Sequence, residues 1–144
     1  MRSTRLGMAA AGVLLAGLPA LGLGAEPPSP ADLKRGERLY LQCRACHSLG
    51  TDPEGKIGPA LGGVVGRKAA AVPGYAYSKA LAGAGLTWDE ATLDRWLAQP
   101  STLVPGTSMV YAGLSKPEDR RQLIAYLRVA TTPWRGHQGL PAWQ

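Results

Sequence analysis

The chain has 144 residues, the length of a single domain, and its 45% hydrophobic and 18% charged residues give the composition of a globular protein. Phenylalanine is absent, so Trp, Tyr and Leu, with or without a cofactor, would have to fill the interior. The net charge of +6 is spread along the chain without a basic stripe, which argues against nucleic-acid binding.

Residues 1–25 are predicted to be a secretory signal peptide. Arg2 and Arg5 form a basic start, residues 6–23 carry no charge, and small residues close the run. An uncleaved membrane anchor is the competing interpretation, because 18 uncharged residues can just span a bilayer, although Pro19 interrupts them. Cleavage would give an exported, periplasmic protein without stable membrane insertion, since no later segment is apolar enough to span a membrane.

Residues 26–130 are predicted to form the folded domain, and its first helix begins near Ser29. The run 29–32 places an N-cap serine, a proline at the first helical position and an acidic residue in the first turn. Leu33, Gly36 and Tyr40 then recur at helical spacing. This helix is expected to lead directly into a pair of cysteines.

Cys43-Arg44-Ala45-Cys46-His47 has the C-x-x-C-H spacing of covalent haem attachment. Each thiol can add to one haem vinyl group, and the histidine can then face the iron as an axial ligand. A zinc site would need His137 as its fourth ligand, from a Gly- and Pro-bearing tail. A dithiol redox site favours a βαβ neighbourhood that is absent from the pattern, and a disulfide leaves His47 without a role. One haem c attached through Cys43 and Cys46 is therefore the preferred interpretation.

The segment 50–74 is rich in Gly and Pro and is predicted to be a loop. So long a loop is reasonable in a compact domain if it wraps a large, flat cofactor. A short helix is expected over 75–82. A capping-box spacing between Thr87 and Glu90 then predicts a helix that ends at Pro100.

Met109 is the candidate sixth ligand of the iron. It follows a loop that opens with turn residues, and the other methionines, Met1 and Met8, lie in the predicted signal peptide. A lone methionine in a loop is ordinarily a flexible gap-filler. Beside a C-x-x-C-H motif, its soft and neutral thioether becomes a ligand that favours Fe(II) and raises the reduction potential.

The last predicted helix begins at a capping signature over 115–118 and buries apolar residues between 123 and 130. Residues 131–144 contain further Gly and Pro and are predicted to be an irregular C-terminal extension. The pattern as a whole predicts an all-α domain of three main helices and one or two short ones, wrapped with long loops around one covalent haem.

These motifs resemble a class I cytochrome c, of the type shared by mitochondrial cytochrome c and its short bacterial relatives, over about residues 31–129. The segments that carry the resemblance are 36–40, 43–49, 57–61, 63–68, 74–78, 104–109 and 123–127. The resemblance implies the cytochrome c fold. It also implies a one-electron carrier that uses a His/Met-ligated haem and is not an enzyme.

The resemblance also implies a role for individual residues. His47 and Met109 would be the axial iron ligands, and the carbonyl of Pro59 would accept a hydrogen bond from the His47 ring. Three side chains would hydrogen-bond the buried haem propionates: Arg67, Tyr77 and Trp88. The aromatic members of this set would pack on the haem even if they served only as core.

Four further positions complete the comparison. Thr107 would lie near a propionate or an internal water, and Gly36 would let the first helix cross closely over the last. Trp96 stands where the family usually has Tyr beside the methionine, and Leu81 stands where many relatives have Asn. Both departures would make the methionine side drier.

The expected partners are redox proteins that bind a monomeric carrier transiently, with weak steering toward acidic patches. One alternative is a cytochrome subunit docked in a dehydrogenase or oxidase complex through residues 131–144. Another is a haem enzyme or gas sensor, which needs an open iron position; a methionine ligand at position 109 argues against it.

Overall fold

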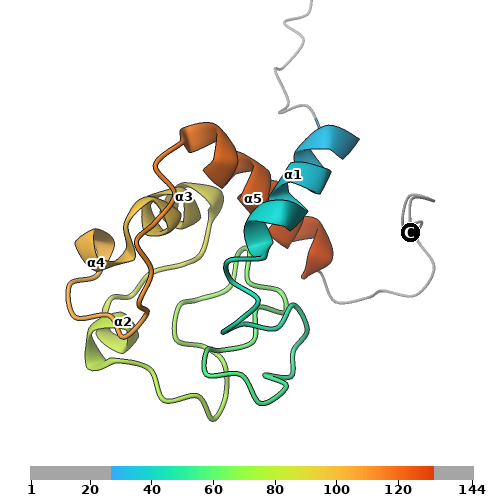
Figure 1. The fold of residues 1–144 in the computed structure, drawn as a ribbon. Coiled ribbons are helices and arrows are strands. Elements are labelled where there is room, and N and C mark those ends of the chain that lie inside the picture. The colour runs from blue at the N-terminus through green and yellow to red at the C-terminus, as the bar shows by residue number, and fades with distance from the viewer. Residues whose placement is uncertain (1–26, 132–144) are drawn as a thin grey trace, which may run out of the picture.

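The computed structural model describes residues 27–131, in which five helices are joined by long loops (Figure 1). The helices are α1 (Pro30–Tyr40), α2 (Lys79–Gly83), α3 (Glu90–Ala98), α4 (Pro100–Leu103) and α5 (Pro117–Ala130). Between residues 27 and 131 the only β-pairing is an isolated antiparallel bridge between Lys68 and Thr87. The predicted all-α architecture, with three main helices and two short ones, is therefore confirmed.

Two predictions about the chain ends fall on residues without a described structure. The predicted signal peptide, 1–25, and nearly all of the predicted extension, 131–144, lie outside the described residues. Within residues 27–131, no helix combines the length and the apolar character that crossing a membrane requires.

Helix α1 begins where the capping residues place it. The Ser29 hydroxyl accepts a hydrogen bond from the Asp32 amide (3.1 Å), and the Asp32 carboxylate accepts one from the Ser29 amide (3.3 Å). The helix packs against α5 along Gly36, because a Cβ there would meet the Gln122 carbonyl and the Tyr126 side chain. Two elements from opposite ends of the domain are thereby held in close contact.

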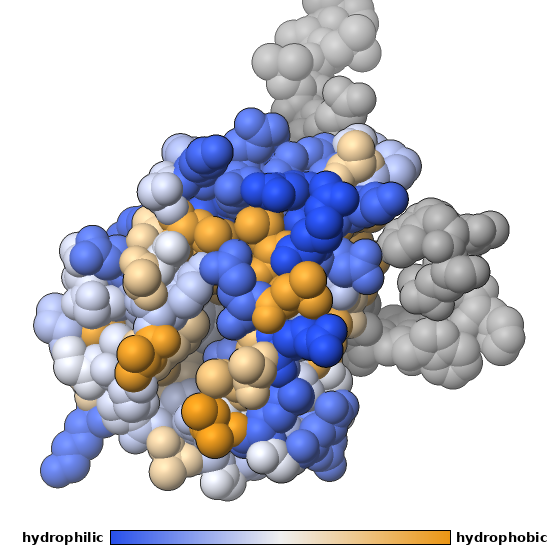
Figure 2. All heavy atoms as spheres, viewed as in Figure 1, coloured by the Kyte–Doolittle hydropathy of each residue, from blue (hydrophilic) through white to orange (hydrophobic). Residues whose placement is uncertain are grey.

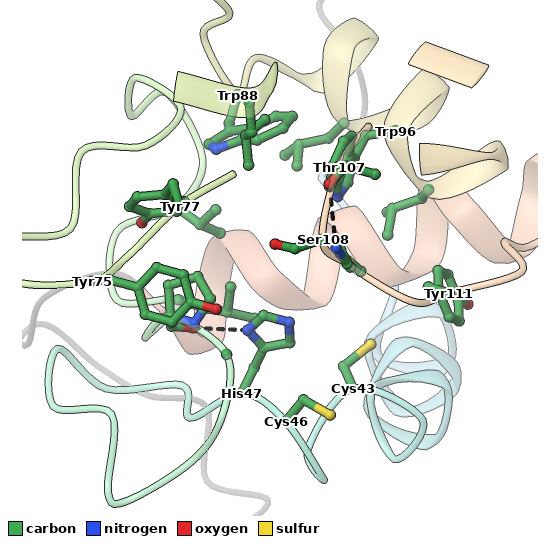
Figure 3. Close-up of a pocket in the computed structure, with 18 of the residues that line it drawn as sticks. Cys43, Cys46, His47, Tyr75, Tyr77, Trp88, Trp96, Thr107, Ser108 and Tyr111 are labelled. Carbon is green, nitrogen blue, oxygen red and sulfur yellow. Dashed lines mark hydrogen bonds between the residues drawn. The ribbon is translucent and has the colours of Figure 1, made fainter. Parts of the chain in front are cut away.

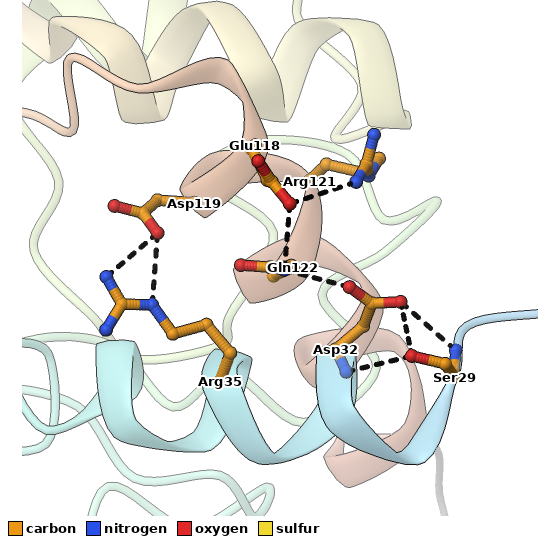
Figure 4. A network of polar contacts seen from close by, with 7 residues as sticks. All are labelled: Ser29, Asp32, Arg35, Glu118, Asp119, Arg121 and Gln122. Carbon is orange, nitrogen blue, oxygen red and sulfur yellow. Dashed lines mark hydrogen bonds and ion pairs between the residues drawn. The ribbon is translucent and has the colours of Figure 1, made fainter.

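A network of polar contacts reinforces the pairing of α1 with α5 (Figure 4). The Gln122 amide donates to the Asp32 carboxylate over 2.8 Å. One turn further along, the Arg35 guanidinium donates to Asp119 over 3.0 and 3.1 Å. The hydrogen bonds from Ser29 and Gln122 lower the pKa of Asp32 below 3.8.

Replacement of Asp32 by asparagine is expected to flatten the acid limb of the stability profile. Because the folded-state pKa is lowered, the ionised carboxylate stabilises the domain above pH 3.8, and this contribution is lost as the pH falls through the lowered value. Urea unfolding between pH 7 and pH 3 should show wild type and D32N converging at the acid end. The control is Glu37→Gln on the same helix, outside this network; a constant difference between wild type and D32N at every pH would refute the linkage.

The starts of α3 and α5 differ from the capping predictions. Asp89, not Thr87, is the N-cap of α3, and its carboxylate accepts a hydrogen bond from the Thr92 amide (2.7 Å). Helix α5 starts at Pro117 without a side-chain cap, so the predicted cap at Ser115 is wrong. The predicted helix over 75–82 appears later and shorter, as α2.

Pro100 follows the end of α3, as predicted, and it also begins the next helix. Helix α3 ends at Ala98, and Pro100 is the first residue of the short helix α4. Proline suits a first helical position because its missing N–H would have had no helical partner there. The two helices together form one side of the hydrophobic core, in which α3 contributes Leu93, Trp96 and Leu97.

Candidate haem site

A cavity of ≈ 260 Å³ lies among the loops, α3 and α5 (Figure 3). Residues from widely separated parts of the sequence line it. The lining includes all eight residues that were predicted to bind or ligate the haem: Cys43, Cys46, His47, Pro59, Arg67, Tyr77, Trp88 and Met109. The fold thus brings the C-x-x-C-H motif and the methionine to one site.

A set of turns after α1 presents the motif to the cavity. The amides of Cys46 and His47 both donate to the Cys43 carbonyl, over 3.0 and 2.9 Å, and the Tyr40 hydroxyl donates to the His47 carbonyl over 2.7 Å. In Figure 3 both sulfur atoms and the imidazole face the same space. Two thiols and a histidine on one edge of a cavity suit attachment and ligation of one haem.

The electrostatics of Cys43 argue against a dithiol redox centre. Burial, and to a smaller extent the neighbouring Cys46 thiol, raise the pKa of Cys43 to about 11. Reactive cysteines of exchange enzymes have a lowered pKa, since the thiolate is the attacking species. The raised pKa of Cys43 therefore lacks the signature of an exchange-reactive thiol.

The His47 ring is held by the loop that follows the motif. Its Nδ1 lies 2.7 Å from the Pro59 carbonyl oxygen, a hydrogen bond in which the ring nitrogen donates. Gly58 permits this approach, because a Cβ there would lie 2.6 Å from both the imidazole and the Cys46 carbonyl oxygen. The Nδ1 bond leaves Nε2 as the nitrogen with a free lone pair for iron.

The environment of the Arg67 side chain suits the binding of an anion. Its Nη1 and Nη2 donate to the carbonyls of Gly62 (2.5 Å) and Ala60 (3.0 Å), whereas its Nε is buried without a partner among the described residues. Burial lowers the pKa of Arg67, and within residues 27–131 no carboxylate lies within ion-pair distance of it. A haem propionate would supply both the missing acceptor and the missing negative charge.

Tyr77 and Trp88 line the cavity together with Arg67, and the Trp88 amide donates to the Arg67 carbonyl over 2.8 Å. The Tyr77 hydroxyl accepts a hydrogen bond from the Val72 amide (3.3 Å), so its own proton is available to a further acceptor. Trp88 is buried and packs on Trp96, with ring centroids 5.1 Å apart. The propionate roles implied for these two aromatics stay predictions.

The methionine side of the cavity is largely apolar. Trp96 and Leu81 are both buried and line it, beside Leu93. Thr107 has a local role that the sequence did not indicate, because its hydroxyl accepts a hydrogen bond from the Met109 amide (3.3 Å). This bond fixes the backbone from which the thioether projects.

Sequence reasoning did not single out two residues at the edge of the site. Tyr111 and Gln42 both line the cavity, and the Tyr111 hydroxyl donates to the Gln42 side chain over 3.4 Å. The contact joins the methionine segment to the cysteine segment across 69 positions of sequence. The only sequence signal for this contact was that each of the two residues lies close in sequence to a proposed haem contact.

The cavity, the paired thiols and the unsatisfied arginine define a protein that binds haem covalently. The family model for cytochrome c matches residues 33–131, and the chain belongs to this family. It carries a covalent c-type haem, for which Cys43 and Cys46 have the attachment spacing, and it is a haem-containing electron carrier.

Named relatives agree with this assignment. The chain is 45% identical to cytochrome c2 of Rhodomicrobium vannielii over 108 residues, which cover 75% of this chain and 86% of the relative. It is 47% identical to cytochrome c of Chlamydomonas reinhardtii over 108 residues, covering 74% and 96%. Among solved structures, cytochrome cH from Methylobacterium extorquens is similar, with a TM-score of 0.64 and 46% identity over 68% of this chain and 98% of that one.

Proposed function

We propose that this protein is a periplasmic carrier of single electrons whose haem iron is ligated by His47 and Met109. The observation that supports the proposal most directly is that both residues line the cavity that Cys43 and Cys46 also line. With both axial positions taken by the protein, external ligands would be excluded, and electrons would leave through the haem edge.

The bound haem supplies the Fe(III)/Fe(II) couple, and the chain's own residues set the conditions for it. Pro59 orients His47 through the hydrogen bond that its carbonyl accepts from Nδ1. Trp96 and Leu81 keep water from the methionine side, which disfavours the more highly charged ferric form. Arg67 would neutralise a propionate inside the protein.

The surface near the cavity suits brief encounters with redox proteins. Ile57 and Val110 line the cavity and are exposed, by 80% and 102% respectively. On the face drawn in Figure 2, hydrophobic patches are small and lie among hydrophilic residues. Small apolar contacts of this kind support short-lived complexes rather than permanent ones, which favours a monomeric shuttle over a docked subunit.

A redox titration followed by optical spectroscopy tests the proposed function. We expect one reversible one-electron transition, a low-spin spectrum in both states, and a weak far-red band of thioether-ligated ferric haem. The reduced native protein should not bind CO rapidly. Rapid CO binding would instead indicate an open iron site and a sensor or enzyme, and stable co-purification with a membrane complex would favour a docked subunit.

A further inference from the structure

We propose that Arg120 is a positioning residue for Met109. By clamping the far end of the segment that carries the methionine, Arg120 would keep the thioether where it can ligate the iron. This inference rests on the proposed function, because it takes Met109 to be an axial ligand. Arg120 lies on a helix and outside the cavity, and the inference gives it a role in keeping the site closed.

The segment that carries Met109 runs from α4 to α5 without helix or strand (Figure 1). The Met109 amide donates to Thr107, and the next backbone hydrogen bond is the one from the Leu114 amide to the Leu97 carbonyl of α3 (2.8 Å). Between them, residues 110–113 make no backbone–backbone hydrogen bond with any described residue. Within this stretch the Tyr111 hydroxyl donates to the Gln42 side chain over 3.4 Å. The position of the methionine therefore depends on this one long contact and on how firmly the ends of the segment are fixed.

Arg120 provides the strongest fixation at the C-terminal end. Its Nη1 donates to the carbonyls of Leu114 (2.8 Å) and Ser115 (3.0 Å). Its Nε and Nη2 donate to the two carboxylate oxygens of Asp94 on α3, over 2.7 and 3.3 Å. One guanidinium thus joins α5, α3 and the methionine segment.

The burial of this clamp makes it strong and specific to arginine. The Arg120 side chain is only 10% exposed, so its charge needs all of these acceptors in place of water. A lysine at this position keeps the charge but cannot reproduce the planar fork that binds a carboxylate and two carbonyls together. The contact between α1 and α5 has its own network around Asp32 and Arg35, so loss of the clamp should loosen the segment before it unfolds the helices.

Imidazole binding to the ferric holoprotein measures the proposed effect. Exogenous imidazole can reach the iron only when the methionine has left, so its apparent affinity rises with the population of the open segment. We expect Arg120→Lys to bind imidazole at least about tenfold more tightly, since each charge-assisted hydrogen bond lost shifts the equilibrium by about one decade. The matched control is Arg121→Lys, whose side chain is 72% exposed and pairs only at 3.7 Å with Glu118.

Helical circular dichroism on the same samples separates positioning from plain stability. Unchanged imidazole affinity in Arg120→Lys, even with a lower unfolding midpoint, would overturn the inference. Asp94→Asn gives a second test in case the first variant folds poorly, because the Asp94 side chain is 41% exposed and its loss should only weaken the clamp. We expect this variant also to bind imidazole more tightly than wild type. Unchanged imidazole affinity would count against the clamp.

Met109→Ala distinguishes the inference from the function on which it rests. If this variant binds imidazole no more tightly than wild type, the axial assignment itself is wrong. If it binds more tightly while Arg120→Lys and Asp94→Asn do not, the methionine is the ligand and only the role of Arg120 is refuted.

Discussion

Replacing Met109 with alanine is expected to lower the reduction potential of the haem by a few tenths of a volt, a large part of the ~0.8 V range that axial ligands span. The thioether stabilises Fe(II), and no second methionine lies between residues 27 and 131 to replace it. A water or hydroxide ligand would favour Fe(III) instead. Potentiometric titration measures the shift directly.

Two spectroscopic changes should accompany the fall in potential. The far-red band of the ferric form should disappear, and the reduced protein should bind CO because its sixth position is open. Val110→Ala is the matched control, since it truncates the fully exposed neighbour without touching the proposed ligand. Retention of the wild-type potential and spectrum in M109A would show that another group ligates the iron.

Replacing Gly36 with alanine is expected to destabilise the domain by about 2 kcal/mol, because overpacking costs typically about 1–3 kcal/mol. The new Cβ would collide with the Gln122 carbonyl and the Tyr126 Cβ, neither of which is the far end of a flexible side chain. Alanine is a better helix former than glycine by about 1 kcal/mol, which offsets only part of the collision. The helices must therefore move apart along their main contact.

Thermal unfolding monitored by circular dichroism should show the effect as a fall in Tm of roughly 8–16 °C, at about 4–8 °C per kcal/mol for a domain near this size. Gly83→Ala is the control, because this glycine also lies in a helix, but an added methyl group would meet nothing within 4 Å apart from its chain neighbours and the backbone of its own helix. That variant should gain about 0.4–1 kcal/mol from the restricted unfolded chain. Equal behaviour of the two variants would contradict the packing argument.

The haem site was predictable because its signals are local and chemical. The haem is indicated by a motif of five consecutive positions that contains Cys43, Cys46 and His47. Met109 became the candidate ligand because the other methionines lie in the predicted signal peptide. Local patterns also predicted the fold class. The start of α1, for example, is indicated by adjacent capping residues. A pattern confined to a few neighbouring positions can be recognised from the sequence without knowledge of the tertiary structure.

The features that sequence reasoning missed depend on contacts between distant residues. Thr87 and Asp89 are both good helix caps, but Thr87 is held extended by its bridge to Lys68, so α3 starts two residues later than expected. Arg120 looks like an ordinary charge on a helix surface until Asp94, 26 positions away, is placed beside it. Such roles are decided by tertiary structure, which periodicity and capping rules do not contain.

The pairing of α1 with α5 has a consequence for the biosynthesis of this protein. The first helix cannot find its partner until nearly the whole domain has been synthesised, because the partner lies at the other end of the folded chain. Until then the two thiols after α1 stay outside the cavity that half-buries them in the native state. Late closure therefore leaves an interval in which Cys43 and Cys46 are accessible before folding covers them.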